Sequence, residues 1–157
     1  MKQRAIRTTR RQGVWVALIA CMCMPGLSPA QTAPEKAIRA RQSGYYLMGQ
    51  QMARISATIK GDLAFNRTAL ETSAEALDVI GRLVADSYPA GSDQGGTKAK
   101  PEIWRETPRF KQLAQASQSE VARLTAAVRG GDLDAIKAAY GATSKSCQSC
   151  HDDYRAR

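Results

Sequence analysis

The stretch Cys147-Gln148-Ser149-Cys150-His151, which ends six residues before the C-terminus, is the most informative part of this sequence. Two thiols three residues apart lie on one face of a helix, where they can add to the two vinyl groups of a haem. The next residue then places an imidazole on the iron. Cys-x-x-Cys-His is the attachment signature of c-type haem, whereas redox dithiols and zinc sites share Cys-x-x-Cys alone. Because His151 is the single histidine of the chain, the motif predicts one haem c bound covalently through Cys147 and Cys150, with His151 as the iron ligand.

Residues 1–30 are predicted to be an export signal. Five basic residues precede or border a short apolar run at 14–24, and the small side chain of Ala30 suits cleavage before Gln31. The apolar run is shorter than the roughly 20 residues that a membrane-spanning helix needs. We therefore expect a periplasmic protein whose folded domain covers residues 31–157 and has no transmembrane segment.

Two alternatives for the N-terminus stay open. Residues 18–21 resemble a bacterial lipobox, which would make Cys21 a lipid-anchored first residue, and Arg10-Arg11 hints at twin-arginine export. General secretion is favoured, because a haem attached after translocation requires export of an unfolded chain. Cys21 and Cys23 leave with the signal, so the mature chain keeps only the two cysteines of the motif.

The net charge falls when the signal is removed. The full chain carries 23 basic and 14 acidic residues, a formal net charge of +9, and five of the basic residues but none of the acidic ones belong to the signal. The mature chain therefore carries +4, and two haem propionates would lower this further. A net charge this small gives little support to nucleic-acid binding. The remaining 127 residues suit one domain with one core.

Helical periodicity runs through the mature sequence, and no alternating strand pattern stands out. The boundaries between the helical segments are marked by three kinds of signal. These are prolines and acidic residues suited to first helical turns, a glycine pair, and a long loop rich in turn residues. Four helices are predicted: 34–61, 62–85, Thr107-Pro108 to Gly130-Gly131, and Asp132 to the C-terminus, with a loop at 88–97. Such helices with mostly short connections predict an all-α fold, an antiparallel four-helix bundle.

The predicted last helix carries the attachment motif on its apolar face. Six residues share that face by their spacing: Leu133, Ile136, Tyr140, Cys147, His151 and Tyr154. The haem is therefore expected inside the bundle rather than on a surface loop.

The predicted first helix has one charged residue in its apolar stripe. Arg41 belongs to a regular series whose other members are apolar or aromatic: Ile38, Tyr45, Met48, Met52, Ile55 and Ile59. A buried guanidinium without a partner is costly. Arg41 therefore either extends to solvent at the end of the bundle or pairs with a haem propionate, which a guanidinium can bind through two hydrogen bonds. A haem in the core favours the propionate.

The mature chain resembles the cytochrome c′ family over essentially all of its length. Three stretches carry the resemblance: 37–43 leading to Leu47-Met48, then 100–104, and finally 147–155. Cytochromes c′ are four-helix bundles. The C-terminal position of the motif, together with the arginine-glutamine stretch of the first helix, points to this family. The resemblance implies a five-coordinate, high-spin iron with His151 on one side and packed side chains on the other.

The resemblance also implies which residues surround the haem. Arg41 and Gln42 match first-helix residues that contact the haem at its propionates, and Thr97 resembles a further contact position. Arg155 matches a basic residue one turn beyond the histidine, although it can equally be an exposed cation that favours the helix dipole. Tyr45 matches the position that faces the iron from the distal side, where a bulky side chain excludes water and admits only small diatomic ligands.

The distal side offers more than one interpretation. The Tyr45 phenol could donate a hydrogen bond to a bound ligand, or it could be packed in the core with its hydroxyl outward. Tyr88 resembles a second distal aromatic residue, or anchors its loop. Met48 lies one turn from Tyr45, and related bundle cytochromes use a first-helix methionine as a sixth iron ligand. A methionine at helical spacing is, however, more often a core residue.

Three functional hypotheses follow. The favoured one is a haem protein, not an enzyme, that binds nitric oxide or carbon monoxide at a five-coordinate iron and can exchange electrons with an unidentified redox partner. The second is a low-spin electron carrier with Met48 on the iron. The third, a thiol oxidoreductase using Cys147 and Cys150, lacks the strand-helix alternation of that fold, and zinc would find too few ligands. The resemblance further suggests a homodimer that pairs first helices, with second helices as an option.

Overall fold

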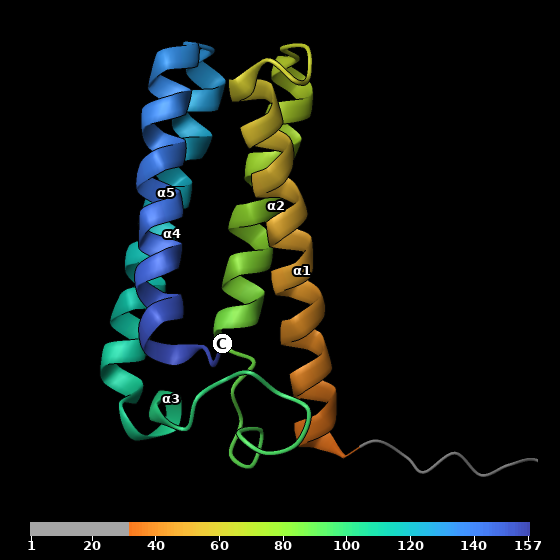
Figure 1. Ribbon diagram of the computed structural model, residues 1–157, viewed down its shortest axis with the longest axis vertical. Helices are drawn as coiled ribbons and strands as arrows, with labels where there is room; N and C mark the ends of the chain where they lie inside the picture. Colours follow the sequence, from red (N-terminus) through yellow and green to blue (C-terminus); the bar gives the residue numbers. More distant parts are fainter. Residues whose placement is uncertain (1–31) are drawn as a thin grey trace, which may run out of the picture. The chain divides into compact units, whose positions relative to one another are not determined.

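Four long helices run alternately up and down in the described part of the chain, with a one-turn helix before the third of them (Figure 1). This computed structural model describes residues 32–157, so the predicted signal and Cys21 lie outside the described residues. The helices are α1 Ala33–Lys60, α2 Arg67–Ala85, α3 Glu102–Arg105, α4 Thr107–Gly130 and α5 Leu133–Tyr154. Helix α1 packs beside α2, α2 beside α4 and α4 beside α5, and α5 also meets α1. The predicted antiparallel four-helix bundle is confirmed.

Local capping determines where α1 and α4 begin and end. The Thr32 hydroxyl accepts a hydrogen bond from the Glu35 amide, and the Glu35 carboxylate accepts one from the Thr32 amide, so a reciprocal capping box starts α1. Both helices end where a glycine adopts a left-handed conformation, at Gly61 with φ +84° and at Gly131 with φ +77°. The predicted ends at these glycines are confirmed.

The predicted second helix began too early. Residues 61–66 form a turn, and α2 starts at Arg67, because the Asn66 side chain caps it by accepting a hydrogen bond from the Ala69 amide at 3.0 Å. The amides of Asp62 and Leu63 bond back to the Ala57 carbonyl instead of entering a new helix. An antiparallel neighbour needs this reversal, which helical periodicity does not reveal.

Smaller corrections concern the last two helices. Thr107 is the first residue of α4 rather than its cap, since its hydroxyl donates backward to the carbonyls of Ile103 and Trp104. Asp132 caps α5 from outside by accepting a hydrogen bond from the Asp134 amide, so the helix begins one residue later. Helix α5 ends at Tyr154 instead of reaching the C-terminus.

Two apolar clusters hold the bundle together. The larger contains buried residues from all four long helices, with Met48 and Met52 packed against it: Ile55, Leu70, Ala74, Leu77, Val121, Leu124, Val128 and Ile136. The smaller, which we call the aromatic cluster, joins Ile103, Phe110 and Tyr154, with Tyr88, Trp104 and Cys150 packed against them. The attachment motif therefore meets the core at its aromatic end.

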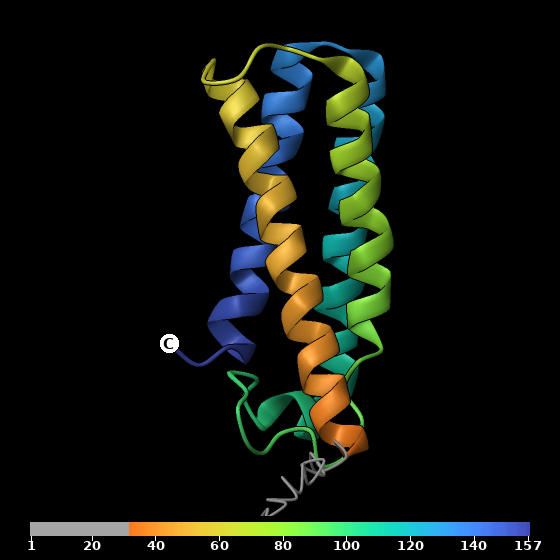
Figure 2. The same ribbon diagram turned by 90° about the vertical axis from the view of Figure 1, so that its right-hand side faces the viewer.

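The segment that links α2 to α3, residues 86–101, is called the strap here. It crosses the end of the bundle at which α1 begins and α5 ends (Figure 2). An isolated β-bridge between Ala99 and Arg155 joins the strap to the chain just after α5. Within it, the Lys100 amide donates to the Tyr154 carbonyl at 3.0 Å and the Ala156 amide donates to the Lys98 carbonyl at 2.8 Å. The strap is thus tied to the helix that carries the cysteines.

Within residues 32–157, no helix combines the length and the apolar character that crossing a bilayer requires.

Candidate functional site

The attachment motif lies in the last two turns of α5. Cys147, Cys150 and His151 are all partly buried, and both thiols are free. Burial raises the pKa of Cys147, and burial followed by the neighbouring charges of Cys147 and Asp153 raises the pKa of Cys150 to about 11. Burial, with the Arg155 charge as a second cause, lowers the pKa of His151. At neutral pH the motif therefore presents two protonated thiols and a neutral imidazole.

Arg41, in α1, is buried beneath the strap. Its side chain is 2% exposed, so the extension to solvent considered from the sequence is wrong. The guanidinium makes four hydrogen bonds to the strap: Nη1 donates to the Ser87 carbonyl at 3.3 Å and to Ser92 Oγ at 2.8 Å, and Nη2 donates to the Ser92 carbonyl and to Thr97 Oγ1 at 2.7 Å. The protein's own oxygen atoms thus stabilise this buried cation.

Two aromatic rings complete the surroundings of Arg41. Its guanidinium carbon lies 4.9 Å from the centroid of the Tyr88 ring and 5.7 Å from that of Trp104, both within the range of a cation–π contact. Burial is the main cause that lowers the pKa of Arg41, yet a guanidinium keeps its proton at any ordinary pH. The strap therefore encloses a permanent positive charge.

Gln42 and Thr97 also belong to the contact between α1 and the strap. Gln42 Nε2 donates to the Gly96 carbonyl at 2.6 Å, next to Thr97. Thr97 Oγ1 accepts from Arg41 and from the Ala99 amide, the latter at 3.1 Å. The structure brings these three sequence-predicted residues together at one end of the bundle, through the strap.

Arg155 lies beside the predicted iron ligand. It follows α5 directly, and its amide donates to the His151 carbonyl at 3.1 Å. Burial lowers the pKa of His151, and the Arg155 charge is a second cause in the same direction. The side chain itself is exposed, and its backbone pairs with Ala99 of the strap. Arg155 is therefore placed both to influence His151 and to close the bundle end.

Tyr45 faces α5 one turn after Arg41. Its hydroxyl lies 3.0 Å from the Tyr88 hydroxyl, and the side chain is 39% exposed. Although part of the side chain is exposed, burial around the hydroxyl raises the pKa of Tyr45, and Tyr88 and Cys150 raise it further. The pKa of Tyr88 is also raised, mainly by burial. Both phenols therefore stay protonated at neutral pH, and both lie near Cys150.

Met48 points toward a different part of the bundle. Its Cε methyl lies 3.4 Å from the position that a Cβ on Gly81 of α2 would occupy. The side chain also packs against the larger apolar cluster. Met48 thus fills the seam between α1 and α2.

Sequence reasoning missed three residues that build the site. Ser92 is fully buried and binds Arg41 through both its hydroxyl and its carbonyl, and Ser87 supplies another carbonyl. Lys100 donates from Nζ to the carbonyls of Asp152 and Asp153, both at 3.0 Å, at the end of α5. Serines in a turn-rich loop and a lysine before a proline carry no signal of these partners. Only the position of Arg41 in the apolar stripe of α1 indicated that a buried hydrogen-bond partner had to exist.

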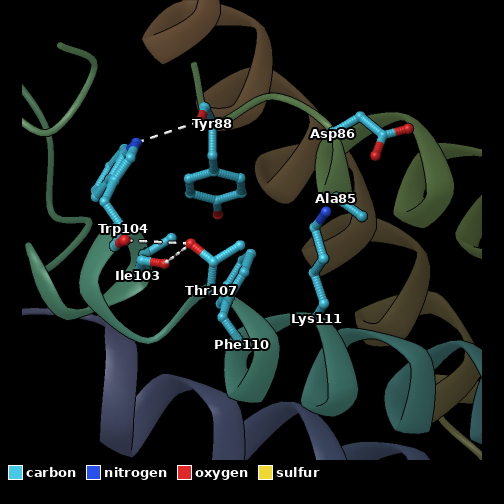
Figure 3. Close-up of a pocket in the computed structure, with 8 residues that line it drawn as sticks. All are labelled: Ala85, Asp86, Tyr88, Ile103, Trp104, Thr107, Phe110 and Lys111. Carbon is cyan, nitrogen blue, oxygen red and sulfur yellow. Dashed lines mark hydrogen bonds between the residues drawn. The ribbon is translucent and has the colours of Figure 1, made fainter. Parts of the chain in front are cut away.

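A small cavity lies behind Tyr88. It has a volume of about 210 Å³ between the strap and α4, and Tyr88, Trp104 and Phe110 are among its eight lining residues (Figure 3). Trp104 Nε1 donates to the Tyr88 carbonyl at 3.2 Å in its wall. No cysteine or histidine lines this cavity, so it is separate from the attachment motif.

The residues at this end of the bundle fit a covalently bound haem. Protonated thiols can add to vinyl groups, a neutral imidazole has a lone pair for iron, and the aromatic cluster beside Cys150 offers an apolar surface to a porphyrin. Arg41 adds a positive charge, with Gln42 and Thr97 beside it, which favours carboxylates at this end of the bundle. Among the residues that the structure describes, no three histidine, cysteine, aspartate or glutamate side chains gather as a metal site.

Comparison with known protein families matches residues 36–155 to the family described as Cytochrome C'. A cytochrome c' from Alcaligenes xylosoxydans xylosoxydans is 36% identical over 124 residues, which cover 79% of this chain and 96% of that protein. A cytochrome c' from Rubrivivax gelatinosus is 32% identical over 125 residues, which cover 79% of this chain and 97% of that protein.

Solved structures are similar in fold as well. The crystal structure of cytochrome c' from Rubrivivax gelatinosus aligns with a TM-score of 0.74 at 31% identity, covering 80% of this chain and 98% of that one. A nitric oxide complex of a mutant cytochrome c prime from Alcaligenes xylosoxidans also aligns with a TM-score of 0.74, at 35% identity, covering 79% and 96% of the two chains.

Replacing Arg41 tests whether the strap depends on it. The substitution Arg41→Met should lower the free energy of unfolding by about 2–4 kcal/mol, because buried oxygens of Ser92 and Thr97 lose a charged donor. Guanidinium chloride unfolding followed by circular dichroism measures this. The matched control, Arg54→Met on the exposed side of α1, should change stability by less than about 0.5 kcal/mol. A loss below about 1 kcal/mol for Arg41→Met would contradict the assignment.

Proposed function

The chain belongs to the cytochrome c′ family, and we propose that it is a periplasmic haem c protein whose five-coordinate iron binds carbon monoxide and nitric oxide and can also exchange electrons. The observation that carries the proposal is the single, neutral imidazole of His151 next to two free thiols, at the aromatic end of a four-helix bundle. Cys147 and Cys150 hold the haem, and His151 binds the iron from one side. The role is one of binding and electron transfer rather than enzymatic turnover.

Five-coordination is supported by the side chains that α1 offers to the other face. A tyrosine binds haem iron as the phenolate in proteins that use it as a ligand, whereas the Tyr45 hydroxyl shares a hydrogen bond with the Tyr88 hydroxyl 3.0 Å away. A protonated phenol donates hydrogen bonds but is a poor metal ligand. The Met48 side chain packs against Gly81 between α1 and α2. Neither residue is therefore suited to occupy the sixth position.

Gas binding is further supported by the relatives. Solved structures of cytochrome c prime variants from Alcaligenes xylosoxidans contain nitric oxide, and they align with this chain over nearly their full length. In this chain, the positive charge of Arg41, with Gln42 and Thr97 beside it, would attract the haem propionates, although the guanidinium nitrogens themselves donate to the strap. Arg155 would lie on the histidine side of the haem, and Tyr45 on the ligand side.

Dimer formation through the first two helices is also part of the proposal. Helices α1 and α2 pack beside each other and, apart from Tyr45 of the candidate site, carry four large apolar side chains that are exposed in the single chain: Tyr46, Leu47, Val79 and Leu83. Exposed apolar groups gathered on neighbouring helices are typical of an association surface. We therefore infer a homodimer in which these helices face their counterparts.

The optical spectrum tests the proposed function. The purified, exported protein should show high-spin bands in both oxidation states, and the ferrous form should bind carbon monoxide, because one axial position is open. The colour should stay with the polypeptide after acid–acetone extraction, since thioether bonds hold the haem. A sharp low-spin ferrous spectrum that ignores carbon monoxide would refute five-coordination. A colourless mature protein would refute the haem itself and favour a dithiol.

Replacing Met48 separates a core residue from an iron ligand. Met48→Ala should leave the absorption spectrum unchanged and lower the free energy of unfolding by about 1–3 kcal/mol, because the side chain is partly buried. Met52→Ala, one turn further along α1, is the matched control and should behave in the same way. If Met48→Ala alone converted a low-spin spectrum to a high-spin one, the electron-carrier hypothesis would replace ours.

The dimer is tested by placing a charge on its proposed surface. Leu83→Lys should convert the dimer to a monomer in sedimentation equilibrium, with the helix content unchanged, because Leu83 is 67% exposed and a lysine there fits the monomer but not an apolar contact. Leu63→Lys, in the turn between α1 and α2, should leave the dimer intact. Equal masses for wild type and Leu83→Lys would count against this surface.

A further inference from the structure

Two tyrosine hydroxyls from distant parts of the sequence meet beside the haem-anchoring thiol. Tyr45 comes from α1 and Tyr88 from the strap, and their oxygen atoms are 3.0 Å apart. Cys150 of α5 is among the groups that raise the pKa of both phenols, which places the pair on the side of α1 and the strap that faces α5. Each hydroxyl has one proton, so only one of them can donate to the other. The hydroxyl that accepts this hydrogen bond keeps its own proton, which it can donate to a third group.

Tyr88 is held by contacts on several sides. Its ring packs edge-on against Trp104 and Phe110, with centroids 5.8 Å and 4.8 Å away. Its carbonyl accepts a hydrogen bond from Trp104 Nε1 at 3.2 Å, and the preceding carbonyl, that of Ser87, binds Arg41. The Tyr88 hydroxyl is therefore presented to Tyr45 from a fixed position.

Arg41 makes the two phenols unequal. Its guanidinium carbon lies 4.9 Å from the centroid of the Tyr88 ring, in a buried position where water does not screen the charge. A cation over a phenol ring favours the build-up of negative charge on its oxygen and so makes the hydroxyl a stronger donor. Burial raises the pKa of both phenols and the Arg41 charge lowers both, but the guanidinium lies over the Tyr88 ring. This contact favours Tyr88 as the donor and Tyr45 as the acceptor of the hydrogen bond between them.

An acceptor that receives a hydrogen bond becomes a better donor through its own proton, because the two bonds polarise one another. We propose that Arg41, Tyr88 and Tyr45 form a hydrogen-bond relay that leaves the Tyr45 proton free to donate to a diatomic ligand at the iron. Tyr88 is then a positioning residue that sets how strongly Tyr45 donates. The relay favours ligands whose outer atom carries partial negative charge over carbon monoxide. This inference rests on the proposed gas-binding function and specifies the ligands that the site prefers.

The infrared stretch of bound carbon monoxide reports the relay directly. Hydrogen-bond donation to the ligand oxygen lowers the C–O frequency, so Tyr45→Phe should move the band of the ferrous holoprotein to higher wavenumber. Tyr88→Phe should move it in the same direction by a smaller amount, because Tyr45 remains but is no longer polarised. The double substitution should match Tyr45→Phe alone. The affinity for nitric oxide relative to carbon monoxide should fall about 3- to 10-fold in Tyr45→Phe, the range expected for one hydrogen bond.

A matched control is available in α5. Tyr140 packs against the larger apolar cluster rather than the aromatic one, so Tyr140→Phe should leave the stretch and the affinity ratio unchanged. Each phenylalanine keeps the aromatic ring, and circular dichroism with the Soret band verifies that the variants fold and carry haem.

Three outcomes would overturn the relay. An unchanged C–O band in Tyr45→Phe would show that its hydroxyl does not reach the ligand. A shift in Tyr45→Phe with none in Tyr88→Phe would show that Tyr45 acts without Tyr88. Additive shifts in the double variant would show two independent donors. Failure of the wild type to bind carbon monoxide would instead refute the proposed function, and this inference with it.

Discussion

The burial of one guanidinium is the constraint on which the rest of the structure depends. Arg41 lies in the apolar stripe of α1, where an unpaired cation would be very costly. The strap removes this cost by directing carbonyl and hydroxyl oxygens of Ser87, Ser92 and Thr97 at it. Because the strap must pass over Arg41 to do so, its course across the bundle end is determined. The same course brings Tyr88 next to Tyr45.

The strap also connects the two sides of the candidate site. Its far end pairs with Arg155 and caps α5 through Lys100, directly after His151. Around the attachment motif, burial keeps the ionisable groups neutral, with protonated thiols, a neutral imidazole and protonated phenols. Among the buried side chains of residues 32–157, Arg41 alone is charged, and hydrogen bonds hold it in place.

The periodicity and the attachment motif are local features, and predictions from them were the most successful. The four long helices follow from apolar spacing, and their ends at Gly61 and Gly131 follow from the conformations that glycine tolerates. The haem follows from three side chains within five residues, 147–151, because covalent attachment needs only that spacing. The start of α2 was misplaced, since a side-chain cap at Asn66 competes with a helical pattern that looks continuous in the sequence.

Three features of the site were determined only by the tertiary structure. The apolar stripe of α1 required a partner for Arg41, but no local pattern shows that it is the fully buried Ser92, 51 residues away. The meeting of Tyr45 with Tyr88 and the engagement of Met48 at Gly81 likewise depend on how α1, α2 and the strap pack. The physical reason is that a sequence pattern shows which polar groups will be buried and need hydrogen-bond partners. Which residues become those partners depends on how distant segments pack in the folded chain. For this protein, the sequence by itself determined the four-helix bundle and the covalent haem, and packing decided which side chains meet Arg41, Tyr45 and Met48.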